Sequence, residues 1–350
     1  MEEDLSIFLV DDSPTSRLAL RQALTSQAGV RILGEAVNGK EALEKIPGAN
    51  PDVVLMDVAM PVMDGITATK MLTAQDGRRH IMLISDLAER DRHLGFRGLE
   101  AGALDVMQKP TGRELRDLEF CRRWVKKLRL LSKVPLVSRR SPRAGPAAPA
   151  NRLAPPAVSR RYRYLCVGAS TGGPQSLQRL LSSLGGKPPW PILIVQHISE
   201  GFVKGLSSWL TDTTGVIVRL AATGEAPEPG VAYLPPDGVH LTLRQHELTL
   251  VGPAAGARAD HVPSVDVLFD SVVDSGAGVA TLAVLLTGMG ADGARGLLRV
   301  REAGGWTIAQ DEATSVVYGM PKAAHKLGAA CEVLPLDAIG PRALGLTRPS

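Results

Sequence analysis

Residues 5–12 read LSIFLVDD and residues 52–57 read DVVLMD, so two short apolar runs each end in aspartate. Apolar runs of this length, separated by segments with a helical period, are typical of buried parallel strands. Three further runs predict strands, at residues 30–36, 80–85 and 104–107. Helices are expected from Ser13 and Asn38, which are residue types that suit an N-cap. Five strands alternating with helices predict an α/β fold with a five-stranded, doubly wound sheet.

A second alternating pattern begins at Tyr164. It predicts strands with helical segments between them, at residues 164–167, 192–195, 280–286 and 307–309. Residues 231–251 contain closely spaced short strands that Pro235, Pro236 and Gly238 interrupt. We therefore expect a second α/β domain with a parallel sheet and a β-hairpin insert.

The two patterns are separated by a basic segment. From Phe120 to Arg163 there are thirteen Lys or Arg and no Asp or Glu, whereas the whole chain has a formal net charge of +4, so the remainder carries −9. Residues 135–156 contain six prolines and no periodic apolar face, which predicts an extended tether. The expected domains are residues 1–120 and 162–345, joined by a basic, proline-rich linker at 121–161.

Length and composition suit an ordinary two-domain protein: the chain has 350 residues, of which 44% are hydrophobic and 22% charged. The opening residues MEEDLSIFLV lack the basic region of a signal peptide, and no apolar run has the length of a membrane span. We expect a cytoplasmic protein with no direct membrane insertion. Cys121, Cys166 and Cys331 lack the spacing of a zinc site or disulfide framework and are expected to be buried thiols.

Polar residues follow the predicted strands of the first domain, at the sheet edge where doubly wound folds bind ligands. They are Asp11 and Asp12 after the first strand, Asp57 and Ser85 at the ends of the third and fourth, and Lys109 after the fifth. Crowded carboxylates repel one another unless cations stabilise them, and Mg²⁺ prefers oxygen ligands. We predict Mg²⁺ binding by Asp11, Asp12 and Asp57, phosphoryl transfer to Asp57, and stabilisation of the product by Ser85 and Lys109.

These residues, with MDVAMPVMDG at 56–65 and Lys109-Pro110, resemble the response-regulator receiver family over residues 1–120. The resemblance implies a phosphoaspartate at Asp57, donated by a sensor histidine kinase. Two positions depart from the family pattern. Asp86 stands where a small residue is usual, and Val106 replaces an aromatic residue that would change rotamer on activation. We expect Asp86 to alter the lifetime of the phosphoryl group.

In the second domain, GASTGGP at residues 168–174 follows a predicted strand and contains the G-x-S-x-G pattern around Ser170. This pattern places a serine on a tight turn whose backbone N–H groups can face an oxyanion. A serine nucleophile also needs a base and an acid, and His197 and Asp292 follow two other predicted strands. Six other histidines compete for the role of base: His261 is the strongest alternative, and the others are His80, His93, His240, His246 and His325.

The order Ser, His, Asp along the chain differs from that of the common α/β-hydrolases, whose acid precedes the histidine. GASTGGP, together with four other segments, resembles the catalytic domain of the CheB family of chemotaxis methylesterases across residues 162–340. The four are VQHIS (195–199), DHVPSVDVLF (260–269), LLTGMGADGARG (285–296) and DEATSVVYGMP (311–321).

The resemblance implies roles for the residues of this site. Ser170 is expected to be the nucleophile, His197 the general base and then acid, and Asp292 the residue that orients His197. Thr171 and Met289 are expected near the reacting centre, with oxyanion donors in the Ser170 turn and the Met289-Gly290 loop. The implied substrate is a glutamate γ-methyl ester on methyl-accepting chemotaxis receptors, hydrolysed to methanol without a cofactor. Glutamine deamidation by the same route is left open.

The resemblance also implies that the receiver covers the catalytic cleft until Asp57 is phosphorylated. The alternative is a receiver joined to a nucleotide- or nucleic-acid-binding output module, with GASTGG binding phosphate and the basic linker binding nucleic acid. GASTGG lacks both the GxGxxG spacing and the lysine of a P-loop, and the basic charge lies in a predicted tether. We therefore expect no nucleic-acid partner. A non-catalytic scaffold is disfavoured because Ser170, His197 and Asp292 all follow predicted strands.

Overall fold

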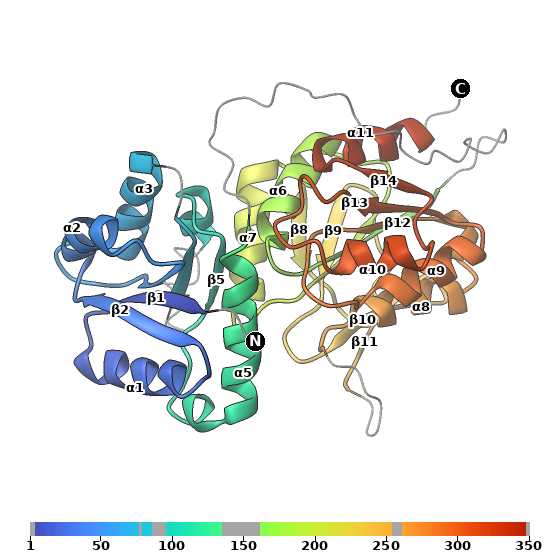
Figure 1. Ribbon diagram of the computed structural model, residues 1–350. Coiled ribbons are helices and arrows are strands. Elements are labelled where there is room, and N and C mark those ends of the chain that lie inside the picture. The colour runs from blue at the N-terminus through green and yellow to red at the C-terminus, as the bar shows by residue number, and fades with distance from the viewer. Residues whose placement is uncertain (1–3, 77–78, 86–95, 135–161, 254–260, 348–350) are drawn as a thin grey trace. The chain divides into compact units, whose positions relative to one another are not determined.

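The computed structural model describes residues 4–76, 79–85, 96–134, 162–253 and 261–347 (Figure 1). The chain divides into two compact units, Met1–Arg143 and Ala144–Ser350. Each unit is built on one parallel sheet, which confirms the predicted α/β class. Among the described residues, no helix combines the length and the apolar character that a membrane span requires.

The first unit contains the five-stranded parallel sheet that the sequence predicts. Its strands are β1 (Leu5–Val10), β2 (Val30–Ala36), β3 (Val53–Asp57), β4 (Ile81–Ser85) and β5 (Asp105–Gln108). Their order is β2-β1-β3-β4-β5, with every pair parallel. Every residue of β1, β3 and β4 is buried, as expected for a sheet that helices cover on both faces.

Helices lie on both faces of this sheet, with α1 and α5 on one face and α2 and α3 on the other (Figure 1). Their bounds are α1 Pro14–Thr25, α2 Gly39–Ala49, α3 Gly65–Asp76 and α5 Leu118–Leu131, with a 3₁₀ turn η1 at Glu114–Arg116. Ser13 and Asn38 cap α1 and α2 as predicted, since each side chain accepts a hydrogen bond from the first turn.

Helix α5 crosses the domain boundary predicted at residue 120, and thus belongs partly to the predicted linker. It has an amphipathic pattern whose buried residues are Cys121, Trp124, Val125, Leu128 and Leu131. Six of the thirteen basic residues lie on this helix or just after it: Arg122, Arg123, Lys126, Lys127, Arg129 and Lys133. The basic charge is therefore not confined to a tether, and residues 135–161 of the predicted linker lie outside the described residues.

The second unit has a seven-stranded parallel sheet and a separate antiparallel hairpin. The sheet order is β14-β13-β12-β6-β7-β9-β8. Its strands are β6 (Tyr164–Ala169), β7 (Ile192–Gln196), β8 (Ile217–Leu220), β9 (Val231–Leu234), β12 (Thr281–Leu285), β13 (Trp306–Gln310) and β14 (Glu332–Leu334). The hairpin consists of β10 (His240–Arg244) and β11 (Glu247–Val251). The hairpin insert is thus confirmed but shorter than predicted, because β9 joins the main sheet.

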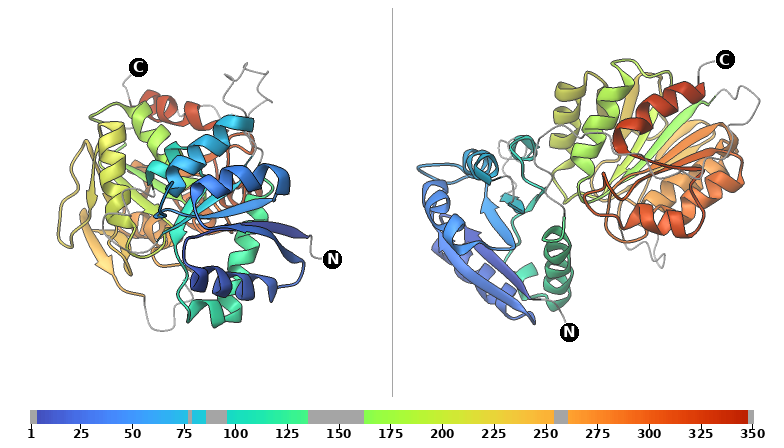
Figure 2. Two further views of the ribbon diagram at one scale, coloured as in Figure 1. Left: turned by 90° about the vertical axis from the view of Figure 1, so that its left-hand side faces the viewer. Right: turned by 45° about the horizontal axis from the view of Figure 1, so that its top comes forward.

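Among the described residues, helices cover both faces of this sheet (Figures 1 and 2). One face carries α6 (Gly173–Leu184), α7 (Val203–Thr214) and α11 (Leu336–Thr347), and the other carries α8 (Val265–Asp274), α9 (Ala294–Glu302) and α10 (Met320–Lys326). A 3₁₀ turn, η2 (Gly278–Ala280), precedes β12. The hairpin packs against α8, so it contributes to the core on that face. All three cysteines are buried and free, as predicted.

Candidate functional site

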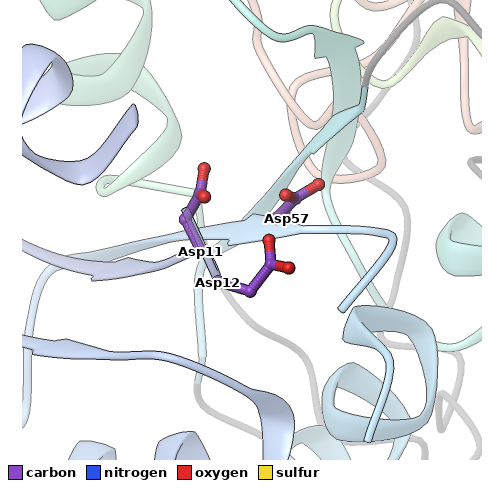
Figure 3. A group of neighbouring side chains, drawn as sticks. All are labelled: Asp11, Asp12 and Asp57. Atoms are coloured by element: carbon purple, nitrogen blue, oxygen red, sulfur yellow. The ribbon is translucent and has the colours of Figure 1, made fainter. Parts of the chain in front are cut away.

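The first candidate site lies where β1 and β3 end side by side. Asp11 follows β1 directly and Asp57 is the last residue of β3. Both are buried, whereas Asp12 is exposed. One carboxylate oxygen from each of Asp11, Asp12 and Asp57 lies within 4.8 Å of the other two (Figure 3). The structure therefore brings together the three carboxylates that the sequence predicts as metal ligands.

Lys109 joins this cluster from the end of β5. Its Nζ lies 2.6 Å from Asp11 Oδ2 and 2.8 Å from Asp57 Oδ2. Burial by itself would lower the pKa of Lys109, but the two carboxylates outweigh that effect and raise it, so the side chain stays cationic. The backbone N–H of Lys109 donates to the carbonyl oxygen of Ser85 at 2.8 Å, which places Ser85 beside Lys109 on the neighbouring strand.

Burial raises the pKa of Asp57 to about 6, although the hydrogen bond and charge of Lys109 oppose the shift. The positive charge of Lys109 alone therefore does not offset the free-energy cost of ionising the buried Asp57 carboxyl group. A hard divalent cation among the three carboxylates would supply the missing positive charge, so these residues fit Mg²⁺. Of the two departures from the family pattern, Val106 is buried in β5, and Asp86 lies outside the described residues.

The second candidate site is built around Ser170, which directly follows β6. Its backbone N–H donates to the carbonyl oxygen of Thr287 at 3.0 Å. The turn depends on glycine, because Gly172 has φ +74° and a Cβ at Gly168 would overlap the side chain of Val265. The G-x-S-x-G pattern is therefore a tight turn that presents Ser170 at the carboxyl edge of the sheet.

Asp292 lies in the loop after β12, against the N-terminus of α8. Its carboxylate accepts hydrogen bonds from the backbone N–H groups of Val265 and Asp266, at 2.7 and 3.0 Å, and from Ser264 Oγ at 2.8 Å. Burial would raise the pKa of Asp292, but the hydrogen bond and charge of His197 and these backbone N–H groups hold it well below its usual range. His197 and, to a smaller extent, the N-terminus of α8 therefore favour the ionised form of Asp292.

His197 follows β7, and its backbone N–H donates to the carbonyl oxygen of Ala169 at 3.0 Å, next to Ser170. The Nε2 atom of His197 lies 2.8 Å from Asp292 Oδ2. In a neutral imidazole, a proton on Nε2 facing the Asp292 carboxylate leaves a lone pair on Nδ1. Nδ1 is buried and has no hydrogen-bond partner among the described residues. The structure thus pairs His197 with Asp292, whereas Ser170 and His197 are not hydrogen-bonded to each other.

Two backbone N–H groups near Ser170 are candidates for binding an oxyanion. One belongs to Thr171, and the other belongs to Met289 in the loop after β12, where Gly288 packs against the Ser170 side chain. Within the part of the chain that the structure describes, neither N–H donates a hydrogen bond. Gly290, with φ +89°, is exposed on the same loop.

Two of the competing histidines support the site without pairing with Asp292. The His261 ring stacks on the His197 ring, with centroids 4.3 Å apart. His240 is buried at the start of β10, and its Nδ1 accepts a hydrogen bond from the backbone N–H of Ser264 at 3.1 Å. Sequence reasoning missed Ser264 and the role of His240, because both act through contacts between segments that are distant in sequence.

Comparison with protein families assigns each domain to a family. Residues 165–343 match the CheB methylesterase family, and residues 7–118 match the response regulator receiver domain. The protein-glutamate methylesterase/protein-glutamine glutaminase 4 of Geobacter metallireducens is 39% identical over 340 residues, which is 96% of each chain. The protein-glutamate methylesterase/protein-glutamine glutaminase 3 of Myxococcus xanthus is 40% identical over 344 residues, which cover 97% of this chain and 93% of that protein.

Among solved structures, the CheB methylesterase catalytic domain of Thermotoga maritima is 36% identical, with a TM-score of 0.50. The match covers 53% of this chain and 98% of that domain. The receiver-like site, the Ser170 turn and the near full-length relatives all point to the same family. The chain belongs to the CheB methylesterase family, with a response regulator receiver domain preceding the catalytic domain.

Proposed function

We propose that this protein hydrolyses glutamate γ-methyl esters on methyl-accepting chemotaxis receptors, under the control of phosphorylation at Asp57. The observation that carries the proposal is the His197 ring, whose Nε2 is bound to ionised Asp292 and whose Nδ1 lone pair is unused. A histidine held in this tautomer beside a serine turn is the arrangement that general-base activation of serine requires.

The reaction proceeds through an acyl-enzyme. The Ser170 oxygen attacks the ester carbonyl carbon, and the hydroxyl proton passes to His197 Nδ1. The tetrahedral intermediate then collapses, the C–O bond to the methoxy group breaks, and the proton on Nδ1 leaves with methanol. In the second half, water attacks the acyl carbon and loses a proton to Nδ1. The bond from the acyl carbon to the Ser170 oxygen then breaks, that oxygen takes the proton from Nδ1, and the released acid ionises to the glutamate carboxylate.

The developing oxyanion is bound by the N–H groups of Thr171 and Met289, which carry no hydrogen bond to any residue that the structure describes. Fixed backbone donors stabilise the intermediate more than the substrate, because the negative charge is present only after attack. Asp292 stabilises the imidazolium that forms at His197 in the same step. These residues accomplish the chemistry with no cofactor.

In the receiver domain, a sensor histidine kinase donates the phosphoryl group to Asp57. Asp11, Asp12 and Asp57 hold Mg²⁺, which when bound offsets the charge of the carboxylates and of the phosphoryl oxygens. Lys109 bridges Asp11 and Asp57 in this structure and contributes a second positive charge. Ser85, which ends β4, hydrogen-bonds the phosphoryl group.

Glutamine deamidation is the second activity that we propose for the same site. The relatives are named protein-glutamine glutaminases as well as methylesterases. A glutamine side chain enters the same acyl-enzyme route with ammonia in place of methanol as the leaving group. The nucleotide-binding alternative is not favoured, because the GASTGG segment belongs to the CheB methylesterase match.

The test is methanol release from methylated receptor, comparing the wild-type protein with Ser170→Ala. We expect release by the wild type and none above background by Ser170→Ala. A serine-reactive fluorophosphonate should label the wild type and leave Ser170→Ala unlabelled. If both proteins released methanol equally, Ser170 would not be the nucleophile.

A further inference from the structure

A buried glutamine lies between the nucleophile and the base. Gln196 is the last residue of β7, directly before His197, and is 3% exposed. Its Nε2 donates to the carbonyl oxygens of Ser170 and His197, each at 2.8 Å. The two acceptors fix the orientation of the amide, because a flipped amide would place its oxygen against two carbonyl oxygens.

This amide links the two loops beyond the end of the sheet. The pairing of β6 with β7 ends at Ala169 and Gln196, and one further backbone bond runs from His197 to Ala169. Among the described residues, no hydrogen bond runs directly from Ser170 to His197. The Gln196 side chain is thus a second connection between the two loops, and it joins the carbonyl groups of Ser170 and His197 themselves.

The other end of the amide is unsatisfied. The Oε1 atom of Gln196 is buried and has no hydrogen-bond partner among the described residues. It packs over Gly173, where an added Cβ would overlap it, so the glycine makes room for the amide. A buried acceptor without a partner costs free energy, and an apolar side chain of similar volume would avoid that cost.

We infer that Gln196 is a positioning residue, which holds the backbone of Ser170 in place relative to that of His197. Because its Oε1 has no partner among the described residues, its amide stabilises the fold less than a fully hydrogen-bonded amide would. The inference rests on the proposed function, because it assigns Ser170 and His197 as nucleophile and base. Functional sites can contain residues that lower the local stability of the fold. Such residues are expected where the geometry of the reacting groups determines the rate. Small displacements of the reacting groups are enough to slow the reaction, since a shift of about 1 Å can lower the rate by about 100-fold.

The test replaces Gln196 with methionine, with Gln196→Leu as a second apolar variant. Gln310 provides a matched control, because it is buried at the end of β13 and both ends of its amide are bonded. Its Oε1 accepts from Thr287 N–H at 2.8 Å, and its Nε2 donates to the Thr314 carbonyl oxygen at 2.7 Å. Gln310→Met should therefore lower the Tm by about 3 °C or more.

For Gln196→Met we expect a Tm within about 2 °C of the wild type. We also expect fluorophosphonate labelling of Ser170 to slow by about 10- to 100-fold, and kcat for methanol release to fall similarly with KM unchanged. Labelling needs no receptor, so it tests Gln196 even if the proposed substrate is wrong. Labelling within twofold of the wild type would overturn the inference. So would loss of folding in both apolar variants, or a fall in Tm as large as that of Gln310→Met.

Discussion

At the scale of single residues, the proposed mechanism makes the rate depend on which nitrogen of His197 carries the proton. In this mechanism Asp292 holds the proton on Nε2, and the Asp292 carboxylate is stabilised by His197 and by three donors at the start of α8. Losing the carboxylate allows the other tautomer, in which Nδ1 can no longer accept the serine proton. The acid therefore matters through the histidine and not through contact with substrate.

Asp292→Asn should lower kcat for methanol release by about 10³- to 10⁴-fold, because a wrong imidazole tautomer costs about that much. Asp311→Asn is a suitable control, since Asp311 also lies at the carboxyl edge of the sheet but bonds Thr314 instead of a histidine. We expect less than a tenfold effect in the control. A loss below tenfold for Asp292→Asn would show that Asp292 does not orient His197.

Asp57 should make the receiver domain less stable as pH rises. Its pKa is raised to about 6 by burial, so the unfolded chain ionises first and stability falls between about pH 4 and 6. In EDTA at pH 7.5, Asp57→Asn should stabilise the domain by about 1 to 3 kcal/mol, and the difference should vanish near pH 4. Urea unfolding at both pH values measures this.

Metal addition provides the converse measurement. Mg²⁺ should stabilise the wild type at pH 7.5 more than Asp57→Asn, because the variant lacks one anionic ligand. Equal stabilisation of the two proteins by Mg²⁺ would place the ion elsewhere. A wild type that is already more stable than Asp57→Asn in EDTA would contradict the raised pKa.

At the scale of elements, the hairpin supports the loop that contacts Asp292. His240 begins β10 and accepts a hydrogen bond from Ser264 N–H, and Ser264 in turn caps α8 and donates to Asp292. Burial lowers the pKa of His240, so its Nδ1 stays an acceptor at neutral pH. The insert therefore does more than cover the core, because it fixes the loop that holds Asp292.

Replacing His240 with asparagine should preserve activity, because the asparagine Oδ1 can take the place of Nδ1 as the acceptor. His240→Phe removes the acceptor and should lower kcat by about tenfold, with a smaller effect on KM. Steady-state kinetics on the two variants makes the comparison. If both variants had the same kcat, the bond to Ser264 would have no part in positioning Asp292.

The elements show what sequence can predict. Long apolar runs predicted β1, β6 and β7, because buried parallel strands are apolar on both faces. The edge strands β8 and β14 were missed, since they are only four and three residues long and partly exposed. The predicted linker includes part of helix α5, because the basic residues between its apolar positions obscure the helical pattern.

The same limits apply to the site. Ser170, His197 and Asp292 could be predicted because each follows a strand that meets the same sheet edge. The pairing of Nε2 with Asp292, the stacking of His261 and the amide of Gln196 could not, since they depend on side-chain orientation across segments far apart in sequence. Sequence patterns specify which edge a residue occupies, and packing decides which atom faces which.

At the scale of the whole molecule, two sites on separate units must be coupled. Phosphorylation can regulate the esterase only if it changes the relative stability of an inhibited and an active state, by a few kcal/mol for a large effect. The proposed inhibition by the receiver gives a direct expectation. Residues 162–350 alone should release methanol at least about tenfold faster than the unphosphorylated full chain, and a phosphodonor should not change that rate. A slower or phosphodonor-sensitive fragment would contradict inhibition by the receiver.

The central claim is that one chain links phosphorylation at Asp57 to ester hydrolysis at Ser170. The most direct measurement is methanol release from methylated receptor, with and without a small phosphodonor and Mg²⁺, for the wild type, Asp57→Asn and Ser170→Ala. We predict that the phosphodonor accelerates release by the wild type, has no effect on Asp57→Asn, and elicits none from Ser170→Ala. Equal acceleration of the wild type and Asp57→Asn, or no release by the wild type under any condition, would contradict the account.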